Sequence, residues 1–288
     1  MAEYEDFRNE VKPNWCPGCG DFAVLNALGH AAANSGLEPH QLAVVSGIGC
    51  SGRISGYMYA YGFHGTHGRV LPIAQGVKMG NPDLTVVACG GDGDGFAIGM
   101  GHTVHAMKRN MDITYIVMDN QIYGLTKGQT SPRSQLGFIT KTTPGGSIEP
   151  PVAPLEITLA AGATYVAQGF STDIKELTVL IEQAIAHKGF AFVNVYSPCV
   201  TFNRINTYQW FKERLVSVAS LEGYDPGNKL RAQQAVAEHN GLLTGLIYQD
   251  TQSKSYQQLN STGRAKPTGS TELALKQQEF RRLVDEFF

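Results

Sequence analysis

The chain has 288 residues, which fits one large α/β domain, or one domain with an extension, better than two independent domains. Hydrophobic residues make up 42% of it, charged residues only 17%, and the net charge is −2. This composition excludes a disordered chain and a polybasic surface that binds nucleic acid.

Two further features of the sequence bear on where the protein works. The N-terminal sequence MAEYEDFRNE lacks the basic and apolar regions of a signal peptide, and no segment has the roughly 18 apolar residues of a membrane span. We therefore expect a cytoplasmic protein that does not enter a membrane. The five cysteines are an odd number, which argues against a disulfide framework and favours metal or redox chemistry.

Short apolar segments rich in β-branched residues alternate with helical patterns along the chain. The expected strands are 42–47, 84–89, 113–118 and 190–195, and the expected helices are 96–110 and 173–187. On the second helix, Ile174, Leu177, Ile181 and Ile185 share one face. The alternation predicts an α/β fold with a doubly wound, mostly parallel sheet.

Two parts of the chain interrupt this alternation. Residues 123–154 are rich in Gly, Thr, Ser and Pro and exceed the usual length of a connection, which indicates a functional loop or a wrapping arm. After residue 198 the pattern changes again. Residues 251–270 are polar and expected to be extended, and an amphipathic helix is expected near the C-terminus. The apolar face of that helix comprises Leu273, Phe280, Leu283, Val284 and Phe287.

The strongest local signal is GGDGDG at 90–95, directly after a predicted strand and before a predicted helix. Backbone N–H groups at such a turn bind phosphate, but Asp92 and Asp94 would repel a bare diphosphate. A Mg²⁺ ion between Asp92 and the phosphates removes this conflict, because magnesium prefers oxygen ligands and shares them between protein and phosphate. A second oxygen ligand is therefore expected nearby.

The next predicted strand ends in MDNQIYG at 118–124, which places Asn120 at the carboxyl end of a neighbouring strand, 28 residues after Asp92. A GDG sequence followed at this spacing by an Asn resembles the thiamine diphosphate signature of thiamine-dependent enzymes. The resemblance implies that Asp92, the side-chain oxygen of Asn120 and the backbone carbonyl of Ile122 bind the magnesium ion.

A second glycine motif, GIGCSG at 47–52, formally matches the dinucleotide-binding pattern. That pattern requires an acidic residue about 20 positions later for the ribose, and segment 53–82 contains neither Asp nor Glu. An NAD site is therefore not expected. The same segment carries the cationic or titratable residues Arg53, His64, His67, Arg69 and Lys78, which favours anionic ligands beside it.

Four cysteines lie where they would meet at one edge of the sheet. WCPGCG supplies Cys16 and Cys19, and Cys50 and Cys199 each follow the end of a predicted strand. This set suits a tetrathiolate zinc site and an iron–sulfur cluster equally well. Cys89 lies inside a predicted strand and is expected to be a buried core residue.

Together, CPGCG, GIGCSGR, HGTHGR, GDGDG, DNQIYGLTKGQTSP and the late Cys199 resemble the β subunit of 2-oxoacid:ferredoxin oxidoreductases. The resemblance covers residues 12–205 and implies three cofactors: thiamine diphosphate, Mg²⁺ and a [4Fe-4S] cluster. The cluster would be held by Cys16, Cys19, Cys50 and Cys199. The implied activity is oxidative decarboxylation of a 2-oxoacid, with transfer of the acyl group to coenzyme A and of electrons through the cluster to ferredoxin.

The resemblance also implies a division of the chain and a set of cofactor contacts. Residues 1–200 would form the thiamine diphosphate-binding domain with the cluster ligands, and 201–288 a C-terminal extension packed on this domain or on a partner. The implied cofactor contacts are Ile48, Gly49, Cys50, Ser51, His67, Gly91, Asp92, Gly93, Asp94, Asn120, Ile122, Gly124 and Leu125. The glutamate that activates the cofactor would come from an α subunit.

Arg53 points to the substrate. It stands three residues after Cys50, on a loop expected to border the reacting carbon, and an arginine pairs bidentately with a carboxylate. This favours 2-oxoglutarate over pyruvate, and CSGRISGY followed by HGTHGR also resembles the 2-oxoglutarate branch of the family. We expect Arg53 and His67 to act in catalysis and His64 to bond to the backbone.

Several alternatives stay open at this point. Arg53 would instead contact a partner subunit or a phosphate, and pyruvate would then be the substrate. An acetolactate-synthase-type thiamine lyase would explain GDGDG but not the four cysteines. A zinc- or cluster-containing binding module would explain the cysteines but not GDGDG together with Asn120.

Overall fold

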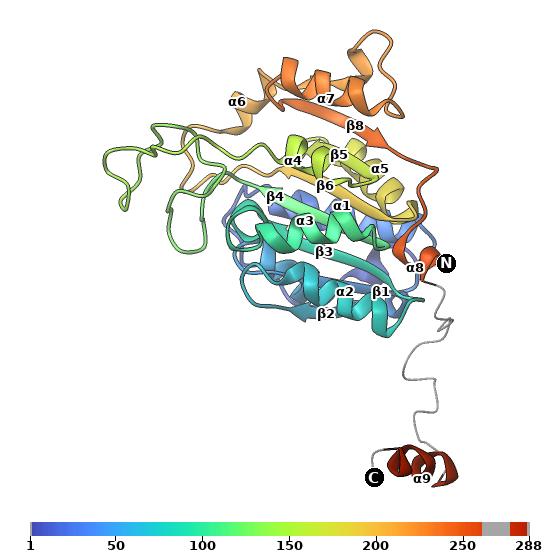
Figure 1. Ribbon diagram of the computed structural model, residues 1–288. Coiled ribbons are helices and arrows are strands. Elements are labelled where there is room, and N and C mark those ends of the chain that lie inside the picture. Colours follow the sequence, from blue (N-terminus) through green and yellow to red (C-terminus); the bar gives the residue numbers. More distant parts are fainter. Residues whose placement is uncertain (1, 261–276, 287–288) are drawn as a thin grey trace.

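The apolar segments predicted as strands form the centre of an eight-stranded sheet in the computed structural model, which describes residues 2–260 and 277–286 (Figure 1). The strand order is β2-β1-β3-β4-β6-β5-β8-β7. The strands are β1 (Leu42–Ser46), β2 (Tyr61–His64), β3 (Thr85–Gly91), β4 (Ile113–Asp119), β5 (Tyr165–Phe170), β6 (Phe190–Tyr196), β7 (Val216–Ser217) and β8 (Leu243–Gln249). All neighbouring strands are parallel except β5 and β8, as the doubly wound fold predicts.

Helices cover both faces of this sheet (Figure 1). The α-helices are α1 (Asp21–Asn34), α2 (Val70–Gly80), α3 (Met100–Arg109), α4 (Pro154–Ala161), α5 (Ile174–Ala186), α6 (Tyr208–Lys212), α7 (Lys229–Glu238), α8 (Tyr256–Leu259) and α9 (Gln277–Asp285). The shorter helical turns are η1 (Tyr4–Phe7), η2 (Pro39–Gln41), η3 (Ser51–Gly56), η4 (Asp94–Ile98) and η5 (Val218–Ser220).

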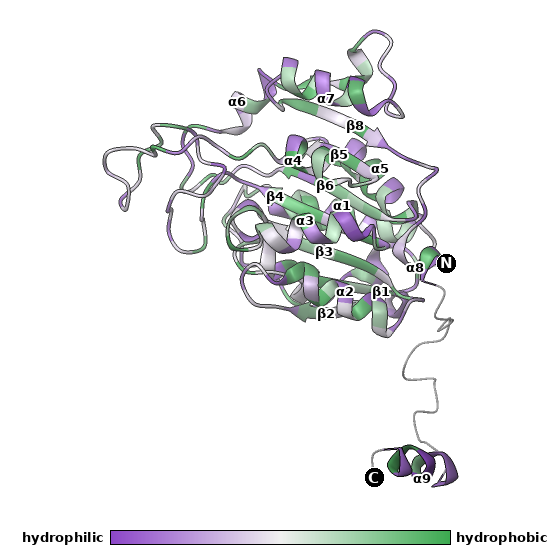
Figure 2. Ribbon diagram, viewed as in Figure 1, coloured by the Kyte–Doolittle hydropathy of each residue, from purple (hydrophilic) through white to green (hydrophobic). Residues whose placement is uncertain are grey.

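Alternate residues of the central strands enter two separate cores. Val44 packs with the buried side chains of α1 and α5, whereas the next residue, Val45, packs with those of α2, α3, α4 and α7. Both valines are almost fully buried. Because each strand is apolar on both faces, β3 and β4 are green along their length in Figure 2. This is the pattern of a sheet covered on both sides.

The helix predicted over 173–187 is α5, and its first turn explains its start. The side chain of Asp173 accepts a hydrogen bond from the backbone N–H of Glu176, which is an N-cap. Leu177 and Ile181 are fully buried, as predicted. Ile174 is 38% exposed, so its place on the buried face was predicted wrongly. It lies in the first turn, where the helix begins at the end of the sheet.

The helix predicted over 96–110 occurs in two pieces. A π-helical turn, η4, covers Asp94–Ile98, and α3 begins after Gly99. A Cβ atom at Gly99 would overlap the backbone carbonyl of Asp94, so the chain passes too close to itself there for any larger residue. π-Helical turns within helices are frequent at functional sites.

The second half of the chain extends the same sheet. β8 pairs antiparallel with β5, and β7 pairs with β8, so residues 216–249 complete one edge. α8 makes part of segment 251–260 helical, although an extended segment was predicted; Ser255 caps this helix through the backbone N–H of Gln258. Residues 261–270, Leu273 and Phe287 lie outside the described residues. On α9, Phe280, Leu283 and Val284 are exposed.

Within the described part of the chain, no helix is both long and apolar enough to cross a membrane.

Candidate functional site

The site forms where four neighbouring strands end at the same edge of the sheet. Strand pairing places Ser46 of β1 beside Cys89 of β3, and Gly91 of β3 beside Met118 of β4. β4 and β6 are likewise paired up to their last residues. The loops that follow these strands therefore start side by side, and they carry the predicted residues from Ile48, Asp92, Asn120 and Cys199 onward. Ligands of open α/β sheets bind at this edge.

Asp92 lies at the bottom of this edge and is 2% exposed. Its Oδ2 accepts a hydrogen bond from the hydroxyl of Ser131. Burial, together with the neighbouring carboxylate of Asp119, raises the pKa of Asp92 to about 8. A divalent cation would favour the charged carboxylate and oppose this shift.

Asn120 is held in a defined orientation at the end of β4. Its Oδ1 accepts a hydrogen bond of 3.0 Å from the backbone N–H of Ile122, and its own carbonyl accepts one of 3.1 Å from Asn203. Gln121, between them, has a φ of 59°, in the left-handed region. An amide oxygen has two lone pairs, so Oδ1 can also bind a cation. The oxygens of Asp92 and Asn120 thus match the donor chemistry that magnesium prefers.

The GDG turn passes very close to two other loops. A Cβ atom at Gly91 would lie 3.2 Å from the hydroxyl of Ser51, and one at Gly93 would overlap the ring of Tyr123. The structure therefore brings Ser51, Gly91 and Gly93 together, as predicted. Glycine is required at position 93 because the aromatic ring occupies the space of a side chain.

Asp94 connects three loops. Its Oδ1 accepts hydrogen bonds from the backbone N–H groups of Ile48 at 3.0 Å and Gly68 at 2.8 Å, and lies 3.0 Å from Nδ1 of His67. The side chain of Asp94 is fully buried. Its carboxylate therefore organises the loops after β1 and β2, whereas its predicted contact with the cofactor stays a prediction.

The predicted cluster cysteines surround a common region. A Cβ atom at Gly124 would lie 3.5 Å from Sγ of Cys50 and 3.6 Å from Sγ of Cys199. The charge state of Cys50 also responds to Cys16 and Cys199, and that of Cys19 to Cys50 and Cys199. All four thiols are thus within electrostatic range of at least one other member of the set.

Burial is the main influence on these thiols. It raises the pKa of Cys50 to about 12 and that of Cys19 further still. Iron is bound by thiolates, so assembly of a cluster here would release protons. Cys89 is fully buried in β3 and packs in the core on the α1 and α5 side, as predicted.

The spacing of the thiols distinguishes two kinds of metal centre. Among the described residues, no three His, Cys, Asp or Glu side chains are close enough together to hold one metal ion. A preformed tetrathiolate zinc site is therefore not present in this conformation. A cluster of several iron atoms needs a wider arrangement of the same four ligands.

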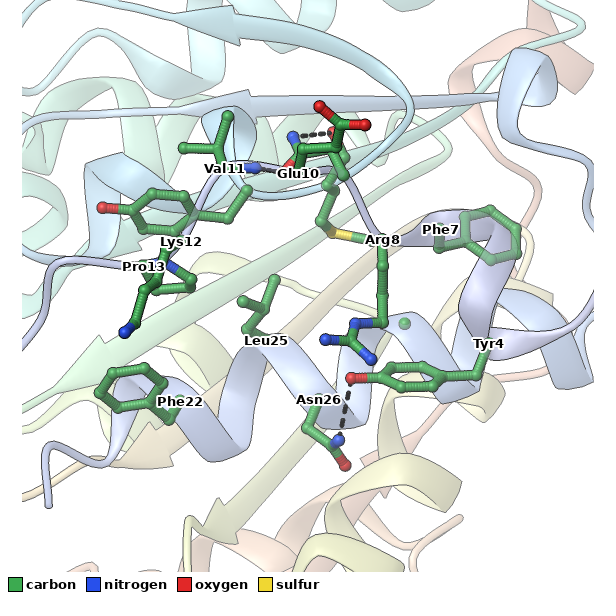
Figure 3. Close-up of a pocket in the computed structure, with 14 residues that line it drawn as sticks. Tyr4, Phe7, Arg8, Glu10, Val11, Lys12, Pro13, Phe22, Leu25 and Asn26 are labelled. Carbon is green, nitrogen blue, oxygen red and sulfur yellow. Dashed lines mark hydrogen bonds between the residues drawn. The ribbon is translucent and has the colours of Figure 1, made fainter.

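Trp15 supports the Cys50 loop from the side of the N-terminal arm. Its indole Nε1 donates a hydrogen bond of 2.8 Å to the carbonyl of Cys50, and its ring meets those of Phe22 and Tyr57 edge-on. The last two residues also line a cavity of about 720 Å³ between the N-terminal arm and α1. Figure 3 shows Arg8 and Asn26 beside the ring of Tyr4 in this cavity. None of the predicted site residues lines it.

The remaining predicted residues differ in their surroundings. Arg53 is exposed on η3, makes no ion pair with any described residue, and acts to lower the pKa of Cys50. Leu125 is 48% exposed on the loop after β4. Gly49 has a φ of 111°, which only glycine adopts easily. Nδ1 of His64 contacts the carbonyl of Gly52, so its predicted bond to the backbone is confirmed.

Several residues of the site were not predicted from the sequence. Asp119 and Arg133 form a buried ion pair of 2.9 Å beside Asp92. Asp21, two residues after Cys19, is fully buried, and the hydroxyl of Ser197 donates to its Oδ1. Burial raises the pKa of Asp21 to about 6. Its isolation was a signal, because it is the single acid in segment 11–37.

Comparisons with known proteins agree with this geometry. Residues 47–195 match the family described as thiamine pyrophosphate enzyme, C-terminal TPP binding domain. Residues 199–263 match the family that describes the C-terminal part of the pyruvate ferredoxin oxidoreductase β chain. The protein therefore carries a thiamine diphosphate-binding domain.

Relatives match most of the chain. A 2-oxoacid:ferredoxin oxidoreductase subunit beta from Sulfolobus sp is 38% identical over 287 residues, covering 94% of both chains. Subunit beta of 2-oxoacid:ferredoxin oxidoreductase 2 from Aeropyrum pernix is 44% identical over 221 residues, covering 77% of this chain and 72% of the relative.

A solved structure matches the fold over nearly its whole length. It is a 2-oxoglutarate:ferredoxin oxidoreductase from Magnetococcus marinus, with 2-oxoglutarate, coenzyme A and succinyl-CoA bound. The TM-score is 0.89 at 38% sequence identity, and the match covers 98% of this chain and 96% of the other. The chain belongs to the family of 2-oxoacid:ferredoxin oxidoreductase β subunits.

Proposed function

We propose that the chain is the β subunit of an enzyme that oxidises 2-oxoglutarate. With coenzyme A, the products would be an acyl-CoA and CO₂, and the two electrons released would reduce ferredoxin. The observation that carries this proposal is the match over 98% of the chain to the enzyme from Magnetococcus marinus, whose structure holds 2-oxoglutarate and coenzyme A. A cytoplasmic location agrees with the free thiols of the five cysteines.

The residues at the carboxyl edge fit thiamine diphosphate and Mg²⁺. Asp92, the side chain of Asn120 and the carbonyl of Ile122 would hold the ion, because oxygen donors suit magnesium and Asp92 is a buried acid without a cationic partner of its own. Bound thiamine diphosphate supplies the electron sink for decarboxylation. The loops with Ser51, Gly93 and His67 would orient it and exclude water.

The four thiols of Cys16, Cys19, Cys50 and Cys199 would hold the [4Fe-4S] cluster. Cys50 lies in the loop directly after β1, and Gly124, beside its sulfur atom, follows the proposed magnesium ligands by two residues. The two centres would therefore lie close together. Short distances favour the passage of electrons from one centre to the other.

An α subunit is needed to complete the site. Segment 39–148, which includes the loops after β1, β3 and β4, contains no glutamate to activate the cofactor. Large apolar side chains are exposed on the loops around the site, which indicates a covering surface on a partner. They are Leu125, Leu136, Ile139, Ile148, Phe202 and Ile205.

Arg53 supports 2-oxoglutarate over pyruvate as the substrate. Its guanidinium is exposed beside the Cys50 loop, and within the described chain no carboxylate neutralises it. 2-Oxoglutarate has a second carboxylate, which an arginine can bind through two parallel hydrogen bonds. Pyruvate has no group for this contact.

The test is steady-state kinetics of the α/β complex with ferredoxin and coenzyme A. We expect kcat/KM for 2-oxoglutarate to exceed that for pyruvate by at least about tenfold, the value of one charge-assisted contact. Equal values, or a preference for pyruvate, would reject the substrate. Failure of either 2-oxoacid to reduce ferredoxin would reject the function.

A further inference from the structure

The side chain of Asp94 has a role that the magnesium and cluster sites do not use. It is a buried carboxylate with three donors around one oxygen: the N–H groups of Ile48 and Gly68 at 3.0 and 2.8 Å, and Nδ1 of His67 at 3.0 Å. Its Oδ2 has no hydrogen-bond partner in the described structure. Asp94 thus binds three groups from two loops and leaves none of its charge exposed to solvent.

The backbone is built to admit this carboxylate. A Cβ atom at Gly47 would overlap its Oδ2, so only glycine fits there. Gly68 has a φ of 71°, and a Cβ on it would lie 2.5 Å from Ile98. Two glycines of the sequence motifs GIGCSG and HGTHGR are therefore explained by the packing of these loops around Asp94.

The contact with Asp94 decides which nitrogen of His67 carries a proton. An ionised carboxylate only accepts hydrogen bonds, so Nδ1 must be the donor. Nε2 points away from Asp94 and is left for another partner. Such a contact from the second ring nitrogen fixes both the tautomer and the orientation of a histidine.

The other side of the imidazole is bounded by Tyr123. The two rings meet at 6.0 Å between centroids and 64° between planes. The hydroxyl of Tyr123 lies 3.4 Å from the carbonyl of Gly93, in the GDG turn. His67 therefore stands between a buried carboxylate and the phosphate-binding turn, and 36% of its side chain is exposed.

We propose that Asp94 is a positioning residue, which fixes the tautomer and orientation of His67 so that Nε2 contacts bound thiamine diphosphate. This inference rests on the proposed function. Asp94 itself touches neither cofactor nor substrate. It acts through His67, and the charge of its carboxylate is what an amide of the same shape cannot replace.

The experiment is a double-mutant cycle with Asp94→Asn and His67→Ala in the α/β complex, with calorimetric titration of thiamine diphosphate as the readout. The asparagine retains an oxygen for the N–H groups of Ile48 and Gly68, so both loops keep their support. We expect Asp94→Asn alone to weaken cofactor affinity about tenfold, the loss of one charge-assisted contact. In the His67→Ala background the same change should alter it less than twofold.

An equal effect of Asp94→Asn in both backgrounds would overturn the proposal, because Asp94 would then act only through the loops. No effect in either background would overturn it as well. If the unmutated complex bound no thiamine diphosphate at all, the proposed function itself would fail, so the two failures are distinguishable.

A second measurement does not depend on the variant folding. Nitrogen NMR of the complex, with ¹⁵N-histidine in the β subunit, identifies the tautomer of His67 at a pH where the imidazole is neutral. The His67→Ala variant assigns the signal by its disappearance. A proton on Nδ1 is the expected result, and a proton on Nε2 alone would overturn the proposal.

Discussion

Arg133 Nε lies 2.9 Å from Oδ2 of Asp119, and both side chains are buried at the carboxyl end of β4. The guanidinium also donates to the carbonyl of Val152 at 2.6 Å. The pair therefore ties the beginning, the middle and the end of the long loop after β4 to the sheet. Without Arg133, the carboxylate of Asp119 would be buried beside Asp92 with no compensating charge.

We expect Arg133→Met to lower the free energy of unfolding by about 3–5 kcal/mol, the usual cost of an unpaired buried charge. Chemical denaturation of the complex measures it. Asp119→Asn added to Arg133→Met should recover part of the loss, because it removes the charge. Arg109→Met, on the exposed side of α3, is the matched control. A cost below about 1 kcal/mol, typical of an exposed ion pair, would contradict a structural role.

Asp92→Ala tests the magnesium site. Removal of this oxygen ligand should abolish magnesium-dependent binding of thiamine diphosphate without unfolding the chain, because the cation would no longer bridge protein and phosphates. Calorimetric titration measures it, and Asp83→Ala, an exposed acid before β3, serves as control. Undiminished cofactor binding in Asp92→Ala would show that the assignment is wrong.

The cluster ligands are tested by five serine substitutions. Serine at Cys16, Cys19, Cys50 or Cys199 should remove or strongly reduce the visible chromophore, since iron in such clusters prefers thiolate. Cys89→Ser should keep it, because Cys89 is a core residue of β3. Absorption spectra of anaerobically purified protein decide the matter. Bleaching by Cys89→Ser alone would refute this set of ligands.

Arg53→Gln tests substrate selection. Loss of one charge-assisted contact of about 1.5–3 kcal/mol should lower the preference for 2-oxoglutarate over pyruvate by roughly ten- to a hundredfold. The ratio of the two kcat/KM values measures this preference, and Arg231→Gln on α7 is the control. If the ratio stays the same, Arg53 has another role, such as a contact with the α subunit.

His187 predicts a dependence of stability on pH. Burial lowers its pKa from the ordinary value of 6.5, against smaller opposing effects of Asp112 and Asp250, and its Nε2 contacts the hydroxyl of Thr164 at 2.7 Å. The unfolded chain thus binds a proton more readily than the folded one. The stabilising contribution is complete above pH 6.5 and is lost as the pH falls below it.

Thermal unfolding at several pH values checks this effect. The wild type should lose more stability on acidification below pH 6.5 than His187→Gln, which has no titrating group at this position. Parallel curves for the two proteins would show that His187 does not contribute.

The central strands could be predicted because each is a continuous apolar run, whereas the edge strands lack that pattern. β5 contains Gln168 and Gly169, and β2 is short, exposed and interrupted by Gly62. Their places depend on pairing with β6 and β1, which no local pattern records. The helical part of segment 251–260 was missed because its polar residues resemble a linker.

Within the site, short motifs directly after strands were the predictable part. Asp94 was predicted from its sequence context, but its bonds to Ile48 and Gly68 depend on how three loops meet. The pairing of Asp119 with Arg133 joins residues 14 apart in a loop with no periodicity. Such contacts arise from tertiary packing and leave no pattern in the sequence.

The account is tested most directly by one spectrum of the anaerobic α/β complex, recorded before and after addition of 2-oxoglutarate and coenzyme A without ferredoxin. The account predicts broad absorption near about 400 nm from the cluster, which decreases when electrons from 2-oxoglutarate reach it. Pyruvate should have a much smaller effect at the same concentration. A complex without this absorption, or one whose absorption responds only to pyruvate, would contradict the account.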